Sequence, residues 1–168
     1  ESVFDSLYRN LVHEPKWLAK YPRVDEGGDF MRLLGLRRLM SARYTAGLSI
    51  YEADLLKNTE ITAMPEHYVR VMGAALHCRI DAEGYLGPLA GLSRPSPVFR
   101  GAAAAPALSN YLKERFDEEW WRVPEAGEFL KELWRDGGRI TFEALSAGTV
   151  DLPRGGEYLR RVIEEGLD

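Results

Sequence analysis

The sequence predicts an all-α fold, an irregular bundle of about six to eight helices around one long central helix. Apolar residues recur at helical spacing through most of the chain. No alternating run of β-branched residues of any length interrupts that pattern, so strands are not expected. A length of 168 residues suits one domain. We expect residues 1–147 to form this helical domain, and residues 148–168 to supply a connector and a C-terminal helix packed on it.

Composition excludes several classes of protein. The chain is 45% hydrophobic and 29% charged, which is ordinary for a globular protein. A net charge of −4 gives no basic surface for nucleic acid, and no apolar run approaches the roughly 20 residues of a membrane span. Cys78 is the only cysteine, which rules out an internal disulfide and fits a reducing compartment. We therefore expect a cytoplasmic protein that binds neither nucleic acid nor membrane.

The first third of the chain predicts two helices. Residues 2–12 carry apolar side chains on one face, and Pro15 and Pro22 bracket a connection. Asp29 can cap a long helix over residues 30–58. Its predicted buried stripe comprises Leu36, Met40, Tyr44, Leu48, Tyr51 and Leu55, widened by Leu33 and Ile50.

The long helix also carries glycines and arginines. Gly35 and Gly47 weaken a helix and so indicate close approach of neighbouring helices. The first half has a positive side, which is either a solvated, salt-bridged face or a site for a carboxylate or phosphate. Its residues are Arg32, Arg37, Arg38 and Arg43.

The middle of the chain predicts a third helix and a loop. That helix begins near Pro65, with Thr62 as a candidate cap, and runs to Ile80. Residues 81–97 are rich in Gly and Pro and predict an irregular loop. Pro106 is expected to kink or offset any helix in the alanine-rich run that follows.

The stretch YLKERFDEEWWRVPEAGEFLKELWRDGG, residues 111–138, has one of the clearest helical repeats. Pro124 begins a helix and Gly137 ends it. Trp120 and Trp121 are expected to fill the corner before this helix and to meet Trp134 in a buried aromatic contact. Short helices are predicted at 142–147 and 158–167. The apolar face of the helix that begins at Pro124 comprises Ala126, Phe129, Leu130, Leu133 and Trp134.

No residue pattern predicts a reactive centre within this chain. The histidines His13, His67 and His77 lack the spacing of a metal site. Cys78 lies on a predicted amphipathic helix beside a histidine that faces elsewhere, and the Gly pairs lack the spacing of phosphate loops. The acidic run Asp117–Glu119 is expected to face solvent. The residues alone therefore favour a scaffold.

The segments YLKERFDEEWW, VPEAGEFLKELWRDG and TFEAL resemble the C-terminal end of gluzincin zinc metallopeptidases akin to oligoendopeptidase F and thimet oligopeptidase. The resemblance is specific over about residues 111–145 and implies a helical catalytic domain whose zinc is bound by an H-E-x-x-H helix and a downstream glutamate. The opening ESVFDSLY is similar to the segment of that glutamate, which would make Glu1 a zinc ligand. The zinc histidines and the general base would then lie upstream.

This resemblance implies a chain that is not catalytic by itself and that forms part of a peptide cleft. Arg94 or Arg100 would bind a substrate carboxylate, and the partner would be the N-terminal part of the same protein or a peptide. Residues 94–99 contain no tyrosine, a departure from the family pattern near Val98. The alternative hypothesis is a stand-alone helical interaction module without chemistry.

Overall fold

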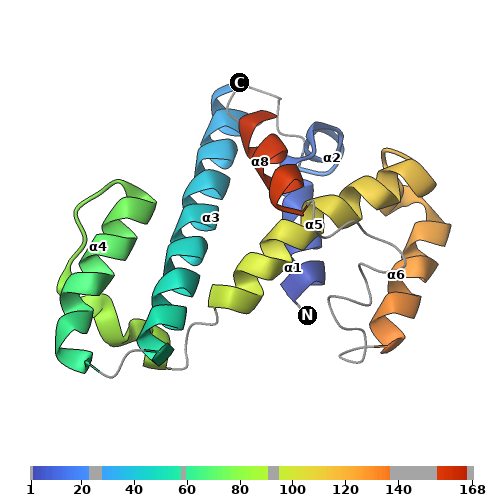
Figure 1. Ribbon diagram of the computed structural model, residues 1–168. Helices are drawn as coiled ribbons and strands as arrows, with labels where there is room; N and C mark the ends of the chain where they lie inside the picture. Colours follow the sequence, from blue (N-terminus) through green and yellow to red (C-terminus); the bar gives the residue numbers. More distant parts are fainter. Residues whose placement is uncertain (1, 23–27, 58–59, 91–94, 137–154, 166–168) are drawn as a thin grey trace. The chain divides into compact units, whose positions relative to one another are not determined.

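The computed structural model describes residues 2–22, 28–57, 60–90, 95–136 and 155–165. These residues form α-helices and short 3₁₀-helices and contain no strand, which confirms the all-α helical bundle (Figure 1). The 3₁₀-helices are Asn10–His13, Ile61–Ala63, Ala82–Ala90 and Trp120–Arg122. The α-helices are α1 (Ser2–Arg9), α2 (Pro15–Lys20), α3 (Gly28–Lys57), α4 (Met64–Leu76), α5 (Pro95–Arg115), α6 (Pro124–Asp136) and α8 (Gly155–Glu165).

The contacts divide the chain into two compact units. Unit 1 comprises residues 1–36 and 100–168, and unit 2 comprises residues 37–99. The helices α3 and α5 each contribute to both units. The domain boundary predicted between residues 147 and 148 lies outside the described residues and stays a prediction.

The core of unit 1 forms on the small side chains of α5. Alanines on this helix leave room for close packing, and α5 runs from Pro95 to Arg115 with Pro106 inside it; the kink or offset predicted at this proline stays a prediction. A proline removes one backbone hydrogen bond, and the helix-favouring alanines around it support the remaining turns. The buried residues of this core are Leu7, Ala104, Ala105, Ala107, Leu108, Leu112, Trp120, Ala126 and Leu130.

The tryptophan corner differs from the prediction. Trp120 is 2% exposed and meets Trp121 edge to face, with ring centroids 5.9 Å apart. Trp134 is 54% exposed and contacts Phe4 and Tyr8 of α1 at 5.5 and 6.2 Å. Tyr8 in turn contacts Trp120 at 6.5 Å, so a tyrosine stands between the indoles that were expected to meet. The prediction that Trp134 is a core residue is wrong, because more than half of its surface is exposed.

The core of unit 2 forms between the second half of α3 and α4, which run side by side in Figure 1. Tyr51 is fully buried, and its hydroxyl donates a 2.8 Å hydrogen bond to the backbone carbonyl oxygen of Tyr85. Tyr68 meets the Tyr51 ring edge to face at 5.0 Å. The other buried members are Leu48, Leu55, Met64 and Met72.

Several local expectations for α3 and for the residues up to position 90 are corrected. Residues 82–90 form a 3₁₀-helix packed on α4 instead of an irregular loop. The N-cap of α4 is Ala63, not Thr62, and α4 ends at Leu76, earlier than Ile80. In the predicted α3 stripe, the buried members are Leu48, Tyr51 and Leu55. The side chains of Leu33, Leu36, Met40, Tyr44 and Ile50 are exposed.

Replacement of Tyr51 by Phe is expected to cost about 1 kcal/mol of unfolding free energy at pH 8, because one hydrogen bond to the partly buried carbonyl of Tyr85 is lost. Burial raises the pKa of the Tyr51 phenol, and neighbouring Tyr85 and Tyr68 act in the same direction. A raised folded-state pKa gives stability that is complete below the unfolded value of about 10 and is lost as the pH rises through the folded value. The wild type should therefore lose stability in alkali faster than Y51F.

Urea unfolding followed by far-UV circular dichroism at pH 8 and pH 11 measures this difference. The exposed Tyr44 provides the matched control, and Y44F should follow the wild type. A gap between wild type and Y51F that stays the same at both pH values would contradict the interpretation.

Candidate functional site

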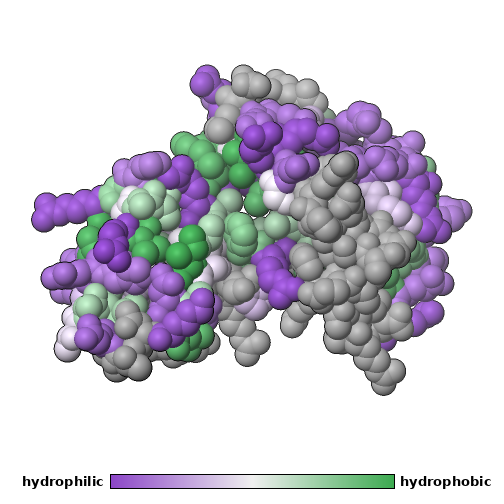
Figure 2. Space-filling model, in the orientation of Figure 1, coloured by the Kyte–Doolittle hydropathy of each residue, from purple (hydrophilic) through white to green (hydrophobic). Residues whose placement is uncertain are grey.

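Unit 2 contains an open groove between α3 and α4. Its volume is about 460 Å³, and nearly all of its lining is apolar. In Figure 2, hydrophobic surface lies over the α3 and α4 pair and is bordered by hydrophilic residues. The groove is lined by Arg43, Ala46, Gly47, Ile50, Arg70, Val71, Ala74 and Ala75.

Small residues explain why a groove forms at this helix pair. A Cβ atom on Gly47 would lie 2.7 Å from the Cβ of Ala75 and 3.1 Å from the sulfur of Met72, so the helices touch at this point. Ala46 and Ala74 reach too short a distance to fill the space above that contact. Ile50 is 57% exposed at the side of the groove. The groove is therefore open to solvent, and its base, which we call the methyl floor, is formed by Ala46, Gly47, Ala74 and Ala75.

Arg43 is held at one end of the groove by the last turn of α4. Its Nε donates to the carbonyl oxygen of Ala75, and one terminal nitrogen donates to that of Ala74 at 3.3 Å. These carbonyls lack helical partners because α4 ends at Leu76 and the next residue, His77, adopts a left-handed conformation with φ of 52°. The guanidinium thus caps the helix, and no carboxylate among the described residues forms an ion pair with it.

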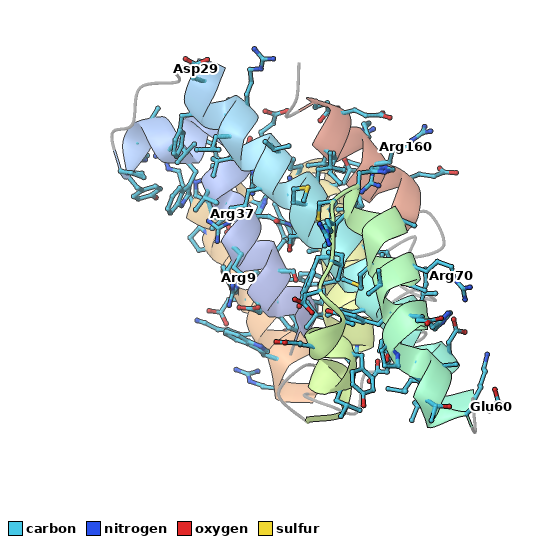
Figure 3. The ribbon with its side chains drawn as sticks, turned by 90° about the vertical axis from the view of Figure 1, so that its left-hand side faces the viewer. Arg9, Asp29, Arg37, Glu60, Arg70 and Arg160 are labelled. Atoms are coloured by element: carbon cyan, nitrogen blue, oxygen red, sulfur yellow. The ribbon has the colours of Figure 1, made fainter. Side chains whose placement is uncertain are left out.

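At Arg70 the groove adjoins a second, polar hollow, which we call the polar corner. This residue lines both the apolar trench and a neighbouring hollow of about 300 Å³ formed by Asp54, Lys57, His67 and Arg70. Figure 3 shows Arg70 on α4 with its side chain directed away from the helix. A terminal nitrogen of Arg70 lies 2.6 Å from Nδ1 of His67, and Nε2 of His67 lies 2.9 Å from Asp54.

The Arg70 contact determines the tautomer of His67. A guanidinium can only donate, so Nδ1 accepts and the ring hydrogen is on Nε2, which donates to Asp54. Both ring nitrogens are therefore engaged, which leaves His67 no lone pair for a metal ion or for a substrate proton. In this arrangement the imidazole positions Arg70.

The groove can bind a ligand that is apolar on one side and negatively charged beside it. Its lining and the polar corner together contain three cations, Arg43, Lys57 and Arg70, and one carboxylate, Asp54. This excess of positive charge contrasts with the net charge of −4 for the whole chain. The residues that line the groove and the polar corner include no Ser or Cys.

The predicted site residues fall elsewhere. Glu1 and Arg94 lie outside the described residues, and their predicted roles stay predictions. Arg100 is exposed on α5 in unit 1 and does not line the groove. Of the arginines on the positive side of α3, Arg43 is the one in the groove lining.

Sequence reasoning missed the contribution of α4. The polar corner combines Asp54 and Lys57 of α3 with His67 and Arg70 of α4, and these residues meet only because the two helices pack together. Gly47 was the available indication, since its lack of a side chain predicted close helix approach. Nothing in the sequence identified the facing residues Ala74 and Ala75.

Over the described ranges, no group of three or more His, Cys, Asp or Glu side chains could hold a metal ion. No helix in this part of the chain has both the length and the apolar character needed to cross a membrane. Comparisons with protein-family models, curated proteins and solved structures found no match.

Proposed function

We propose that this chain is the C-terminal helical portion of a gluzincin-like zinc metallopeptidase, not catalytic on its own, and that it forms part of a peptide-binding cleft. The resemblance over residues 111–145 suggests the family, and the all-α fold is compatible with it. The observation that carries the binding role is the α3–α4 groove, in which a methyl floor adjoins Arg43 and Arg70. Peptide ligands offer apolar side chains and carboxylates together.

The proposal assigns the chemistry to residues outside the described part of the chain. Zinc, when bound in the intact protein, would polarise the scissile carbonyl, with Glu1 as one ligand. The described residues do not fit a zinc site. Both ring nitrogens of His67 are engaged, by Asp54 and Arg70, and no three His, Cys, Asp or Glu side chains of the described residues are placed to hold a metal ion. Calorimetric titration of this chain with zinc should show no tight stoichiometric binding. Tight zinc binding would contradict the proposal that this chain cannot form the zinc site on its own.

Peptide binding can be tested with a pool of short random-sequence peptides and the immobilised chain, with mass spectrometry of the retained fraction. Ala74→Trp should abolish retention, because Ala74 is exposed in the groove lining and an indole would fill the trench. Ala53→Trp is the matched control, since Ala53 is exposed on α3 outside that lining. Retention that is equal for wild type and A74W would contradict binding in the groove.

A second candidate is a stand-alone helical interaction module. It is favoured by the fact that all residues lining the groove belong to unit 2, so this groove needs no other part of the protein. Under either candidate we propose a cytoplasmic location, in agreement with the single Cys78. A reading frame that encodes an H-E-x-x-H segment upstream of Glu1 would exclude the stand-alone module.

A further inference from the structure

We infer that the α3–α4 groove selects acidic amphipathic peptide helices, with apolar side chains on the methyl floor and carboxylates at Arg43 and Arg70. This inference rests on the proposed function, because it names the class of peptide that the same groove takes. Three features of the groove favour such a ligand: its floor of small side chains, the two arginines held at its edge and the positive charge around them.

The floor suits the side-chain ridge of a helix. Ala46, Gly47, Ala74 and Ala75 present methyl groups or no side chain, so a third helix can approach α3 and α4 closely. Helices that dock in this way place apolar residues on one face at spacings of three and four residues. Ile50, exposed beside the floor, extends the apolar contact.

The two arginines are positioned but not neutralised. Arg43 is fixed by the backbone carbonyl oxygens of Ala74 and Ala75, which carry no formal charge. Arg70 is fixed by the neutral Nδ1 of His67, and the Asp54 carboxylate is occupied by the opposite side of that ring. Each guanidinium has five donor hydrogens, and the contacts described use only some of them. Each therefore retains charge and donors for a ligand carboxylate.

The surrounding charge favours an acidic ligand over a basic one. Lys57 adds a third cation at the polar corner, and the single carboxylate there already accepts from His67. A basic helix would place its charges against these cations, which is unfavourable at short range. A neutral apolar helix would fit the floor but would leave both arginines unpaired.

The test compares two short, capped amphipathic peptides that share a leucine face and differ only in Glu against Gln beside it. The Glu peptide should bind wild type about tenfold more tightly, the product of two roughly threefold exposed ion pairs. Added salt should reduce this preference. Calorimetry or fluorescence anisotropy of the labelled peptide measures both effects.

Arg70→Gln should reduce affinity for the Glu peptide about threefold and leave affinity for the Gln peptide unchanged. Arg79→Gln is the charge-matched control, because Arg79 is exposed just beyond α4 and does not line the groove, and it should bind as wild type. Circular dichroism of each variant checks that the helices remain. Arg43→Gln is a second measurement, used if R70Q loses helix content.

Equal affinity for the two peptides would overturn the acidic preference while leaving peptide binding in the groove intact. Retention of pool peptides without binding of either designed peptide would overturn the helix assignment alone. Binding of a free fatty acid such as octanoate with the same Arg70 dependence, and no peptide binding, would overturn the inference and the proposed function together.

Discussion

Replacement of Trp120 by Ala is expected to lower the free energy of unfolding of unit 1 by about 3–5 kcal/mol. Trp120 is 2% exposed and belongs to the cluster formed by α1, α5 and α6. Removal of the indole leaves a cavity that the neighbouring helices can close only in part. Its ring contacts with Tyr8 and Trp121 are lost as well.

Trp134→Ala is the matched control, with an expected loss of about 1 kcal/mol, since that ring is 54% exposed. Chemical denaturation followed by tryptophan fluorescence suits both variants. All four tryptophans, Trp17, Trp120, Trp121 and Trp134, lie in the residues of unit 1, so this fluorescence reports on unit 1. Similar losses for the two variants would mean that the corner is not organised around Trp120.

Replacement of Gly47 by Ala is expected to destabilise unit 2 by about 1–3 kcal/mol. Alanine normally favours a helix over glycine by about 1 kcal/mol, so the expected sign is opposite to the intrinsic propensity. The reason is the 2.7 Å distance between the added Cβ and the Cβ of Ala75, which forces α3 and α4 apart. The side chain of Ala75 has no further torsion by which it could move away.

Gly127→Ala provides the control with the opposite sign. Gly127 lies within α6, and no atom lies within 4 Å of the position its Cβ would take. This substitution should raise stability by about 0.5–1 kcal/mol. Far-UV circular dichroism in urea measures both variants. A stabilising effect of G47A would show that the helices are further apart than described.

Local properties of the sequence predicted most of the helices. The periodicity from Ala126 to Trp134 and the proline at position 124 correspond to α6, whose first residue is Pro124. The long pattern from Phe30 corresponds to α3, although the helix begins at Gly28, ahead of the predicted cap Asp29. These features depend on residues within a few turns of one another, which is the range over which propensity and periodicity act.

Features that depend on distant residues were predicted less well. Trp134 has the spacing of a core residue, yet its exposure is set by how much of the ring α1 covers. The stripe on α3 was predicted as continuous, but burial requires a partner helix, and α4 packs on its second half. The residues next to Arg70 in the sequence do not distinguish it from the other exposed arginines. The groove could therefore not be predicted from spacing within either helix.

The most direct measurement of the binding role is a titration of the isotopically labelled chain with the acidic amphipathic peptide, followed by amide chemical shifts. Shifts concentrated on residues 43–50 of α3 and 70–75 of α4 are the expected result, with loss of the effect in Ala74→Trp. Shifts confined to unit 1, or a response that A74W leaves unchanged, would show that the α3–α4 groove is not the binding surface.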